Sequence, residues 1–112
     1  MKPQTITLTG SGSGATNSAP VRLNWRADST SLSFGTDGST TSFTAQYTMT
    51  PPNGYADASA WASGATWHDC VAVSGATAAA SESLVGPVQG IRLAADASGT
   101  DTGTLIVTQA TV

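Results

Sequence analysis

The stretch Ser-Phe-Thr-Ala-Gln-Tyr-Thr-Met, residues 42–49, decides the fold class of this chain. Hydroxyl and amide side chains alternate in it with the apolar side chains of Phe43, Ala45, Tyr47 and Met49. Because successive side chains of a β-strand point to opposite faces, this two-residue period predicts a strand with one face in a core. Its aromatic and branched residues also favour extended structure.

The same period recurs on both sides of this stretch. We expect further strands with inward-facing apolar side chains at residues 6–8, 21–25, 32–34 and 105–107. Trp25 is expected in the core, with Arg22 and Arg26 on the opposite face of the same strand. Residues 35–38 are predicted to form a hairpin connection. The regular spacing of about seven or eight short strands predicts an all-β antiparallel β-sandwich or jelly roll.

Length and composition favour a single domain over residues 1–112. A chain of 112 residues and 11.2 kDa is long enough for one hydrophobic core and too short for two. Within it, residues 1–4 are expected to form an N-terminal arm and the Gly- and Ser-rich residues 10–19 a flexible loop. The Ala-rich pieces 56–62 and 76–80 can each hold a helical turn, but they lack the apolar face of a packed helix.

The charge balance excludes several classes of partner. Charged residues make up 10% of the chain, and the formal net charge is −3. Four basic residues and a pI near 4.5 do not suit a nucleic-acid backbone or an anionic membrane. No apolar run has the length of a secretion signal or a membrane span. A surface of Ser, Thr and Ala costs little free energy to desolvate, which favours contact with protein.

No combination of residues predicts an active site or a metal site. His68 and Cys70 are expected to share one face of a strand, but no third residue is present to orient them. One His and one Cys are too few ligands for zinc. Aspartates in loops, such as Asp96 and Asp101, are explained by turns better than by calcium. We therefore expect no enzyme activity, no cofactor and no bound metal.

Two groups of side chains are candidates for contact with another protein. Arg22 and Arg26 are predicted on one strand face, where guanidinium groups can bind carboxylates; a solvated face is the alternative. Tyr55 and Trp61 lie in the longest irregular stretch, residues 51–66. Trp61 either closes one end of the sandwich, anchors a protein interface or stacks on a sugar ring.

The order of segments resembles a family of virion proteins. The strand at 42–49 is followed by a Pro/Gly loop and Ala60-Trp61. Gly-Pro-Val-Gln-Gly-Ile-Arg-Leu then stands at 86–93, and Gly-Thr-Leu-Ile-Val-Thr-Gln at 103–109. Over residues 21–109 this order is similar to that of the capsid cement, or decoration, proteins of tailed bacteriophages. The resemblance implies a β-sandwich or jelly-roll dimer or trimer that binds the major capsid protein and holds the shell against internal pressure.

On this resemblance the protein is expected on the capsid surface of the virion, after synthesis in the cytoplasm of the host bacterium. Contacts with the major capsid protein are expected from Lys2, Pro3, Gln4, Arg22, Arg26, Tyr55 and Trp61. Two alternatives stay open. One is a carbohydrate- or receptor-binding module of a tail or head fibre, and the other is a minor tail or head-completion protein.

Overall fold

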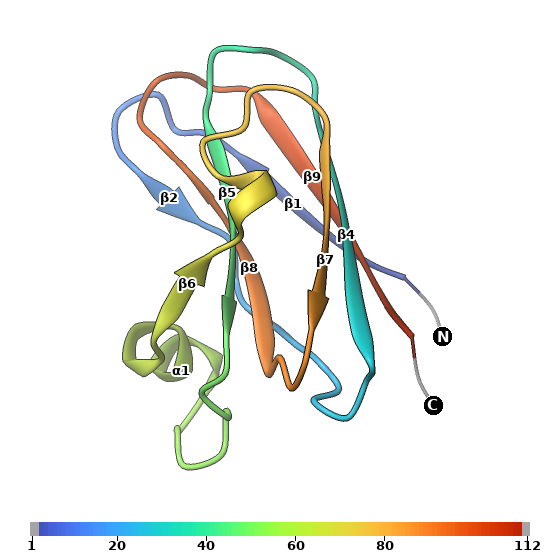
Figure 1. Ribbon diagram of the computed structural model, residues 1–112. Coiled ribbons are helices and arrows are strands. Elements are labelled where there is room, and N and C mark those ends of the chain that lie inside the picture. Colours follow the sequence, from blue (N-terminus) through green and yellow to red (C-terminus); the bar gives the residue numbers. More distant parts are fainter. Residues whose placement is uncertain (1–2, 111–112) are drawn as a thin grey trace.

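The computed structural model describes residues 3–110, which form two antiparallel β-sheets packed face to face (Figure 1). One sheet has the strand order β1-β9-β4-β7, and the other has β2-β8-β5-β6 with β3 also paired to β8. The strands are β1 Gln4–Thr9, β2 Thr16–Asn17, β3 Val21–Arg22, β4 Ser29–Thr36, β5 Phe43–Thr48, β6 Trp67–Asp69, β7 Ala80–Val85, β8 Gly90–Ala95 and β9 Thr102–Ala110. The helices are α1, Ala58–Gly64, and the 3-10 helix η1, Val71–Val73. The expected all-β sandwich is confirmed.

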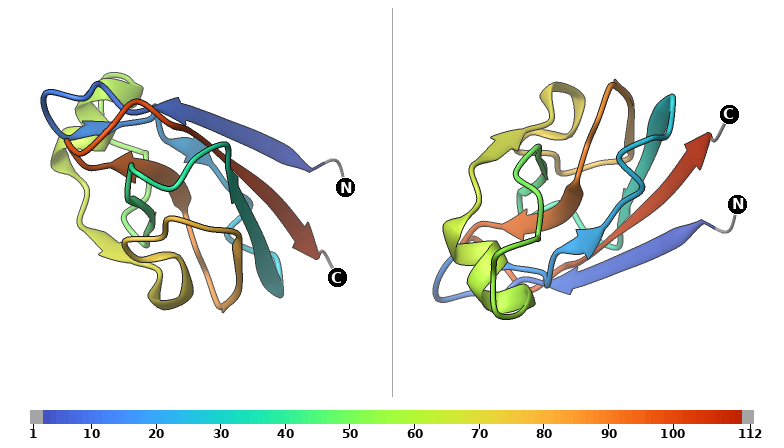
Figure 2. Two further views of the ribbon diagram at one scale, coloured as in Figure 1. Left: turned by 90° about the horizontal axis from the view of Figure 1, so that it is seen from above. Right: turned by 90° about the horizontal axis from the view of Figure 1, so that it is seen from below.

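The strand order is that of a jelly roll. Strands β2 and β3 both pair with β8, so they are two pieces of one interrupted strand. Counted in this way, successive strands lie in opposite sheets except β5 and β6, which pair with each other. This alternation between two sheets is the jelly-roll connectivity. The first and last described strands, β1 and β9, lie side by side in the four-stranded sheet (Figure 2).

The core between the sheets comes from the two-residue alternation that the sequence predicts. Phe43 and Ala45 of β5 are fully buried, as are Leu32 and Phe34 of β4 and Leu105 of β9. Phe34 and Phe43 face each other from opposite sheets, with ring centroids 5.4 Å apart. Their contact joins the two layers at the centre of the core.

Trp25 does not lie in the core as predicted, since 49% of its surface is exposed. The alternation stops at Leu23. Beyond it, the backbone of Asn24 is hydrogen-bonded to the side chain of Gln109 and not to a neighbouring strand. Asn24 N–H donates to Gln109 Oε1 over 3.0 Å, and Gln109 Nε2 donates to the Asn24 carbonyl over 3.0 Å. The chain turns here, with Ala27 N–H donating to the same carbonyl. The turn carries Trp25 to the surface.

Two connections differ from the prediction. The hairpin at 35–38 does not form, because β4 and β5 belong to different sheets and residues 37–42 cross between them. A two-residue hairpin turn needs positive φ, and neither Gly35 nor Gly38 has it. The loop predicted at 10–19 is interrupted by β2. Just after β2, Ser18 N–H donates to the Leu93 carbonyl over 2.8 Å, and Leu93 N–H donates to Ser18 Oγ over 2.9 Å.

Of the two Ala-rich pieces, the first forms α1 and the second forms no helix. Helix α1 buries Trp61 against the five-stranded sheet, so a single large side chain replaces the apolar face that the sequence lacks. Within residues 3–110, no helix is long and apolar enough to cross a membrane.

Candidate binding surface at one end of the sandwich

The predicted contact residues gather toward one end of the sandwich. Strands β3, β5, β7 and β9 finish at this end and β1 begins near it (Figure 1). It therefore carries α1 and the loops 23–28, 49–57 and 86–89, and we call it the aromatic end. Pro3 and Gln4 are exposed here at the start of β1, whereas Lys2 lies outside the described residues.

Helix α1 is fixed at both ends by hydrogen bonds. The Asp57 carboxylate caps its first turn by accepting from Ala60 N–H over 2.8 Å. At the other end, Ala65 N–H donates to the Trp61 carbonyl over 2.9 Å. The Tyr55 ring lies against the last residue, because a Cβ placed on Gly64 would come 2.5 Å from Tyr55 Cε1. The irregular stretch of the sequence is thus an ordered cap on the sheet.

Trp61 is the buried centre of this cap. Only 3% of its surface is exposed, and its Nε1 donates to the Thr50 carbonyl over 2.9 Å. Its ring lies 6.0 Å from that of Trp67, whose Nε1 donates to the Ala62 carbonyl over 3.0 Å. Of the three interpretations of Trp61, the closing of one end of the sandwich is confirmed. An exposed anchor or sugar platform at this residue is wrong, because the ring has almost no free surface.

Arg22 and Tyr55 meet beside Trp61 in one notch. The notch has a volume of about 270 Å³, and its lining also includes Pro20, Pro52, Asp57 and Ala58. Arg22 is exposed at the end of β3, Tyr55 is half-buried in the loop before α1, and both face this shared space. The notch therefore offers a guanidinium beside an aromatic wall, a combination enriched in protein interfaces.

A second hollow, of about 600 Å³, adjoins the notch and shares Pro20 and Ala58 with it. Arg92 of β8 lines it, held by two contacts. Its guanidinium lies 4.4 Å from the centroid of the Trp67 ring, and its Nε donates to Gln46 Oε1 over 2.8 Å. Desolvation lowers the pKa of Arg92 from its usual value. Sequence reasoning missed this arginine, although its place between Ile91 and Leu93 predicts an outward position.

Arg26 lies apart from Arg22, which corrects the prediction of a shared strand face. β3 ends at Arg22, and Arg26 belongs to the following turn, where its guanidinium lies 4.9 Å from the Trp25 ring centroid. Other apolar residues are also exposed at this end: 52% of the surface of Met49 and 82% of that of Val85 are accessible. The accessible tryptophan of the aromatic end is therefore Trp25, which the alternation had assigned to the core.

The opposite end, which we call the aspartate end, carries Asp37, Asp96 and Asp101. All three carboxylates accept from backbone N–H groups, but only Asp96 forms the predicted local turn, with Ser98; Asp37 and Asp101 instead bond to segments 60 to 65 residues away in the chain. Asp101 accepts from Thr40 and Thr41 over 2.8 and 2.9 Å, Asp37 accepts from Thr102 over 2.8 Å, and Asp96 accepts from Ser42 and Ser98. At the aromatic end, Arg22 and Arg26 balance Asp28 and Asp57. The two ends therefore differ by about three negative charges.

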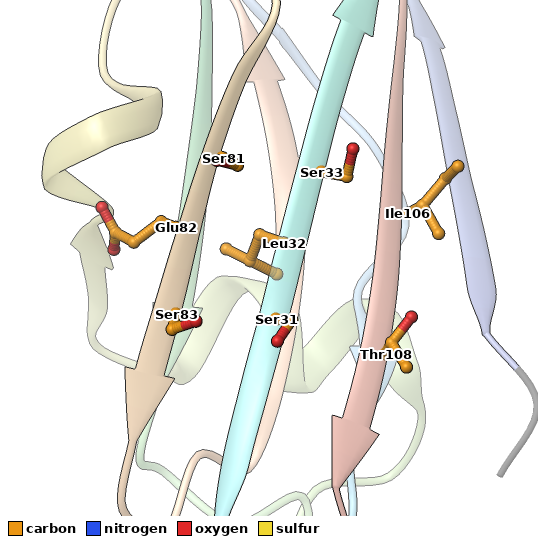
Figure 3. A pocket seen from close by; sticks show the side chains of 8 residues that line it. All are labelled: Ser31, Leu32, Ser33, Ser81, Glu82, Ser83, Ile106 and Thr108. Atoms are coloured by element: carbon orange, nitrogen blue, oxygen red, sulfur yellow. The ribbon is translucent and has the colours of Figure 1, made fainter.

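The outer face of the four-stranded sheet is a second distinctive surface. Its outward positions hold only Ser, Thr, Gly, Ala, Val and Ile. Figure 3 shows its centre, where the serines of β4 lie between Ser81 and Ser83 of β7 and Ile106 and Thr108 of β9. Glu82 and Leu32 alternate to the other side. We call this surface the neutral face.

Neither catalysis nor metal binding is supported by the titratable side chains. His68 is exposed on β6, with its ring 5.3 Å from that of Tyr47. Cys70 is fully buried just beyond β6, and burial, with the charges of Glu82 and Asp69, raises its pKa to about 12. A protonated, buried thiol is a poor nucleophile. Within residues 3–110, no three His, Cys, Asp or Glu side chains lie close enough together to hold a metal ion.

No protein-family model matches the chain, and no curated protein matches it. Among solved structures, the chain is similar to the Spr0440 glycoside hydrolase domain, Endo-D, of Streptococcus pneumoniae R6, with 12% sequence identity and a TM-score of 0.42. The alignment covers 92% of this chain and 17% of that one. A likeness at this level supports no statement about activity or ligand.

Proposed function

We propose that this protein binds the outer surface of a bacteriophage capsid and stabilises the shell, as the resemblance in sequence implies. The observation that best supports a docking role is the difference between the two ends of the sandwich. The aromatic end combines the exposed Trp25 and Met49 with the Arg22 notch, and its charges are balanced. The aspartate end concentrates negative charge.

This difference suggests how the protein is oriented on its partner. Aromatic, Met and Arg side chains are enriched in protein interfaces, whereas Asp is depleted. The aromatic end therefore faces the major capsid protein, and the aspartate end faces water. Gln4, predicted in an N-terminal arm, is instead the first residue of β1 and pairs with Val107, and Pro3 precedes it near the aromatic end, so the start of β1 lies close to the same partner. Binding of this kind needs no cofactor and no catalytic step.

Jelly rolls occur in viral capsid proteins and in lectins, so the fold by itself does not choose between shell binding and sugar binding. The side chains favour the shell. A sugar platform needs a free aromatic face. Trp61 is buried, and Arg26 lies over the ring of Trp25. The alternatives are a fibre module and a head-completion protein, and the following experiments distinguish both from a shell-binding protein.

The direct test is to mix the purified protein with expanded heads that lack it and to sediment the particles. We expect co-sedimentation at a stoichiometric occupancy of hundreds of copies per head. Saturation at a few copies would favour a head-completion protein. Absence of wild-type protein from the pellet, with binding on a glycan array that Trp25→Ala abolishes, would favour the fibre module and overturn the proposal.

Variants locate the contact. The double variant Arg22→Ala with Trp25→Ala is expected to weaken shell binding at least about tenfold, because Arg and Trp dominate the binding energy of interfaces. Both side chains are exposed, so the melting temperature is expected to change little. Asp37→Asn is the matched control, since it changes one charge at the aspartate end. Equal occupancy of the double variant and the control would exclude the aromatic end as the contact.

A further inference from the structure

The two sheets leave four strand edges, and three of them are protected against pairing. Strands β2 and β3 have two residues each, and β6 has three. The β7 edge carries Glu82, whose carboxylate accepts from Ala72 N–H of the adjoining η1. Short strands, charges and covering segments are the means by which proteins keep sheet edges from associating.

Over its described strand residues, Gln4–Thr9, the β1 edge has none of these protections. Its six residues, Gln-Thr-Ile-Thr-Leu-Thr, include no charge and no proline. The register with β9 runs without a bulge from Gln4↔Val107 to Thr9↔Thr102. On the other side of β1, no strand of the described chain pairs with it. An edge of this length and composition is a template for another strand.

The hydrogen-bond pattern shows which groups of β1 face outward. Gly10 N–H donates to the Asp101 carbonyl over 3.0 Å, next to the last pair of the β1–β9 register. In an antiparallel pair, every second residue bonds to the neighbouring strand, so Leu8, Ile6 and Gln4 follow Gly10 in bonding to β9. The N–H and C=O groups of the threonines between them, Thr5, Thr7 and Thr9, therefore point to the free edge.

We propose that this edge binds a second copy of the chain, antiparallel and centred on a two-fold axis at Thr7. Thr7 then lies opposite Thr7 of the partner subunit, and Thr5 opposite Thr9 of the partner subunit. These pairs exchange about six backbone hydrogen bonds. On the inner side, the half-buried Leu8 comes to lie opposite Ile6 of the partner subunit. The two four-stranded sheets become one eight-stranded sheet with a continuous neutral face.

The net charge of the chain and the hydrogen-bonding pattern of the β1 edge both favour a second copy of the chain as the partner at this edge. Two identical molecules of net charge −3 repel each other on average. β1 and the adjoining neutral face carry no charged side chain at their outward positions, so contact there brings no like charges together. The outward groups alternate symmetrically about Thr7, so the edge is complementary to itself, as a two-fold interface requires.

The length of the edge sets the strength of association. Six residues span about 20 Å, so the contact buries less than the roughly 1,000 Å² of a stable interface. The dimer is therefore expected to form reversibly as the concentration rises. This inference concerns the isolated chain and does not depend on the proposed function, so a failure to bind capsids leaves it intact.

The test is sedimentation velocity of the full chain from micromolar to millimolar concentration, where the wild type is expected to pass from monomer to dimer. Thr7→Pro removes an outward N–H but no bond between β1 and β9, so it is expected to weaken the dimer at least tenfold while the sandwich stays folded. Thr7→Val keeps the N–H and is the matched control, expected to dimerise like the wild type.

A charge exchange at the same position tests the two-fold axis and does not depend on tolerance of proline. Thr7→Lys and Thr7→Glu each place like charges opposite one another, so each variant alone is expected to stay monomeric. Their equimolar mixture is expected to form a heterodimer. A wild type that stays monomeric at millimolar concentration would overturn the inference. So would a dimer that is insensitive to these variants, or a mixture that stays monomeric.

Discussion

Trp61 lies directly on Gly90, so closely that a Cβ on Gly90 would come 2.4 Å from Trp61 Cη2. Gly90 begins β8 and pairs with Thr48 of β5, which is fully buried and donates its hydroxyl to the Thr66 carbonyl over 2.8 Å. Helix α1 can cover this part of the sheet because position 90 has no side chain. In this position Trp61 also lines the notch that Arg22 and Tyr55 share.

Gly90→Ala is therefore expected to destabilise the protein by about 1–3 kcal/mol, because the new methyl group overlaps the indole ring. Urea unfolding followed by tryptophan fluorescence measures the change. Gly35→Ala is the matched control, since its new Cβ would have no neighbour within 4 Å and its φ is not positive. Equal stability of the two variants would show that Trp61 does not constrain position 90.

At the aspartate end, Asp101→Ala is expected to cost about 1–3 kcal/mol of unfolding free energy. The change leaves the Thr40 and Thr41 N–H groups without the carboxylate that accepts from both. Asp101→Asn keeps an acceptor oxygen without the charge, so a smaller loss is expected. Thermal or urea unfolding near neutral pH measures both variants. A stability of Asp101→Ala equal to the wild type would contradict the role of this carboxylate.

The thiol of Cys70 is expected to make stability depend on alkaline pH. Its pKa rises from 9.0 to about 12 in the folded protein, chiefly because burial disfavours the thiolate. The neutral thiol therefore contributes its full stabilisation below pH 9.0, and that contribution is lost as the pH rises toward 12. The slope from this single proton is at most about 1.4 kcal/mol per pH unit.

Urea unfolding at a series of alkaline pH values tests this expectation. Cys70→Ala is expected to show a shallower decline than the wild type, since every other side chain is common to both proteins. At neutral pH, the native thiol is expected to react with a thiol reagent only after unfolding, because Cys70 is fully buried. Parallel declines in the two proteins would rule out the thiol as their cause.

The local pattern predicted the strands well where the chain stays extended. The alternation at Phe43 and Ala45 builds β5, and that at Leu105 and Val107 builds β9, with these side chains inside. This succeeds because the two-residue period is a property of the extended backbone itself. The turn at Asp96 was predicted for the same reason, since its side chain bonds to the nearby Ser98 N–H. Asp37 and Asp101 bond to remote segments, which local pattern does not predict.

The sequence by itself determined an all-β chain with weakly charged strands and polar turns. Only the tertiary structure decided that Trp25 is exposed and Trp61 is buried, and that Arg22 meets Tyr55 in one notch. The reason is that these outcomes depend on partners remote in the chain. Gln109 ends the alternation before Trp25 from 85 residues away, and the bare backbone of Gly90 makes room for Trp61. Periodicity specifies which residues can face a core, and packing between distant segments selects which of them do.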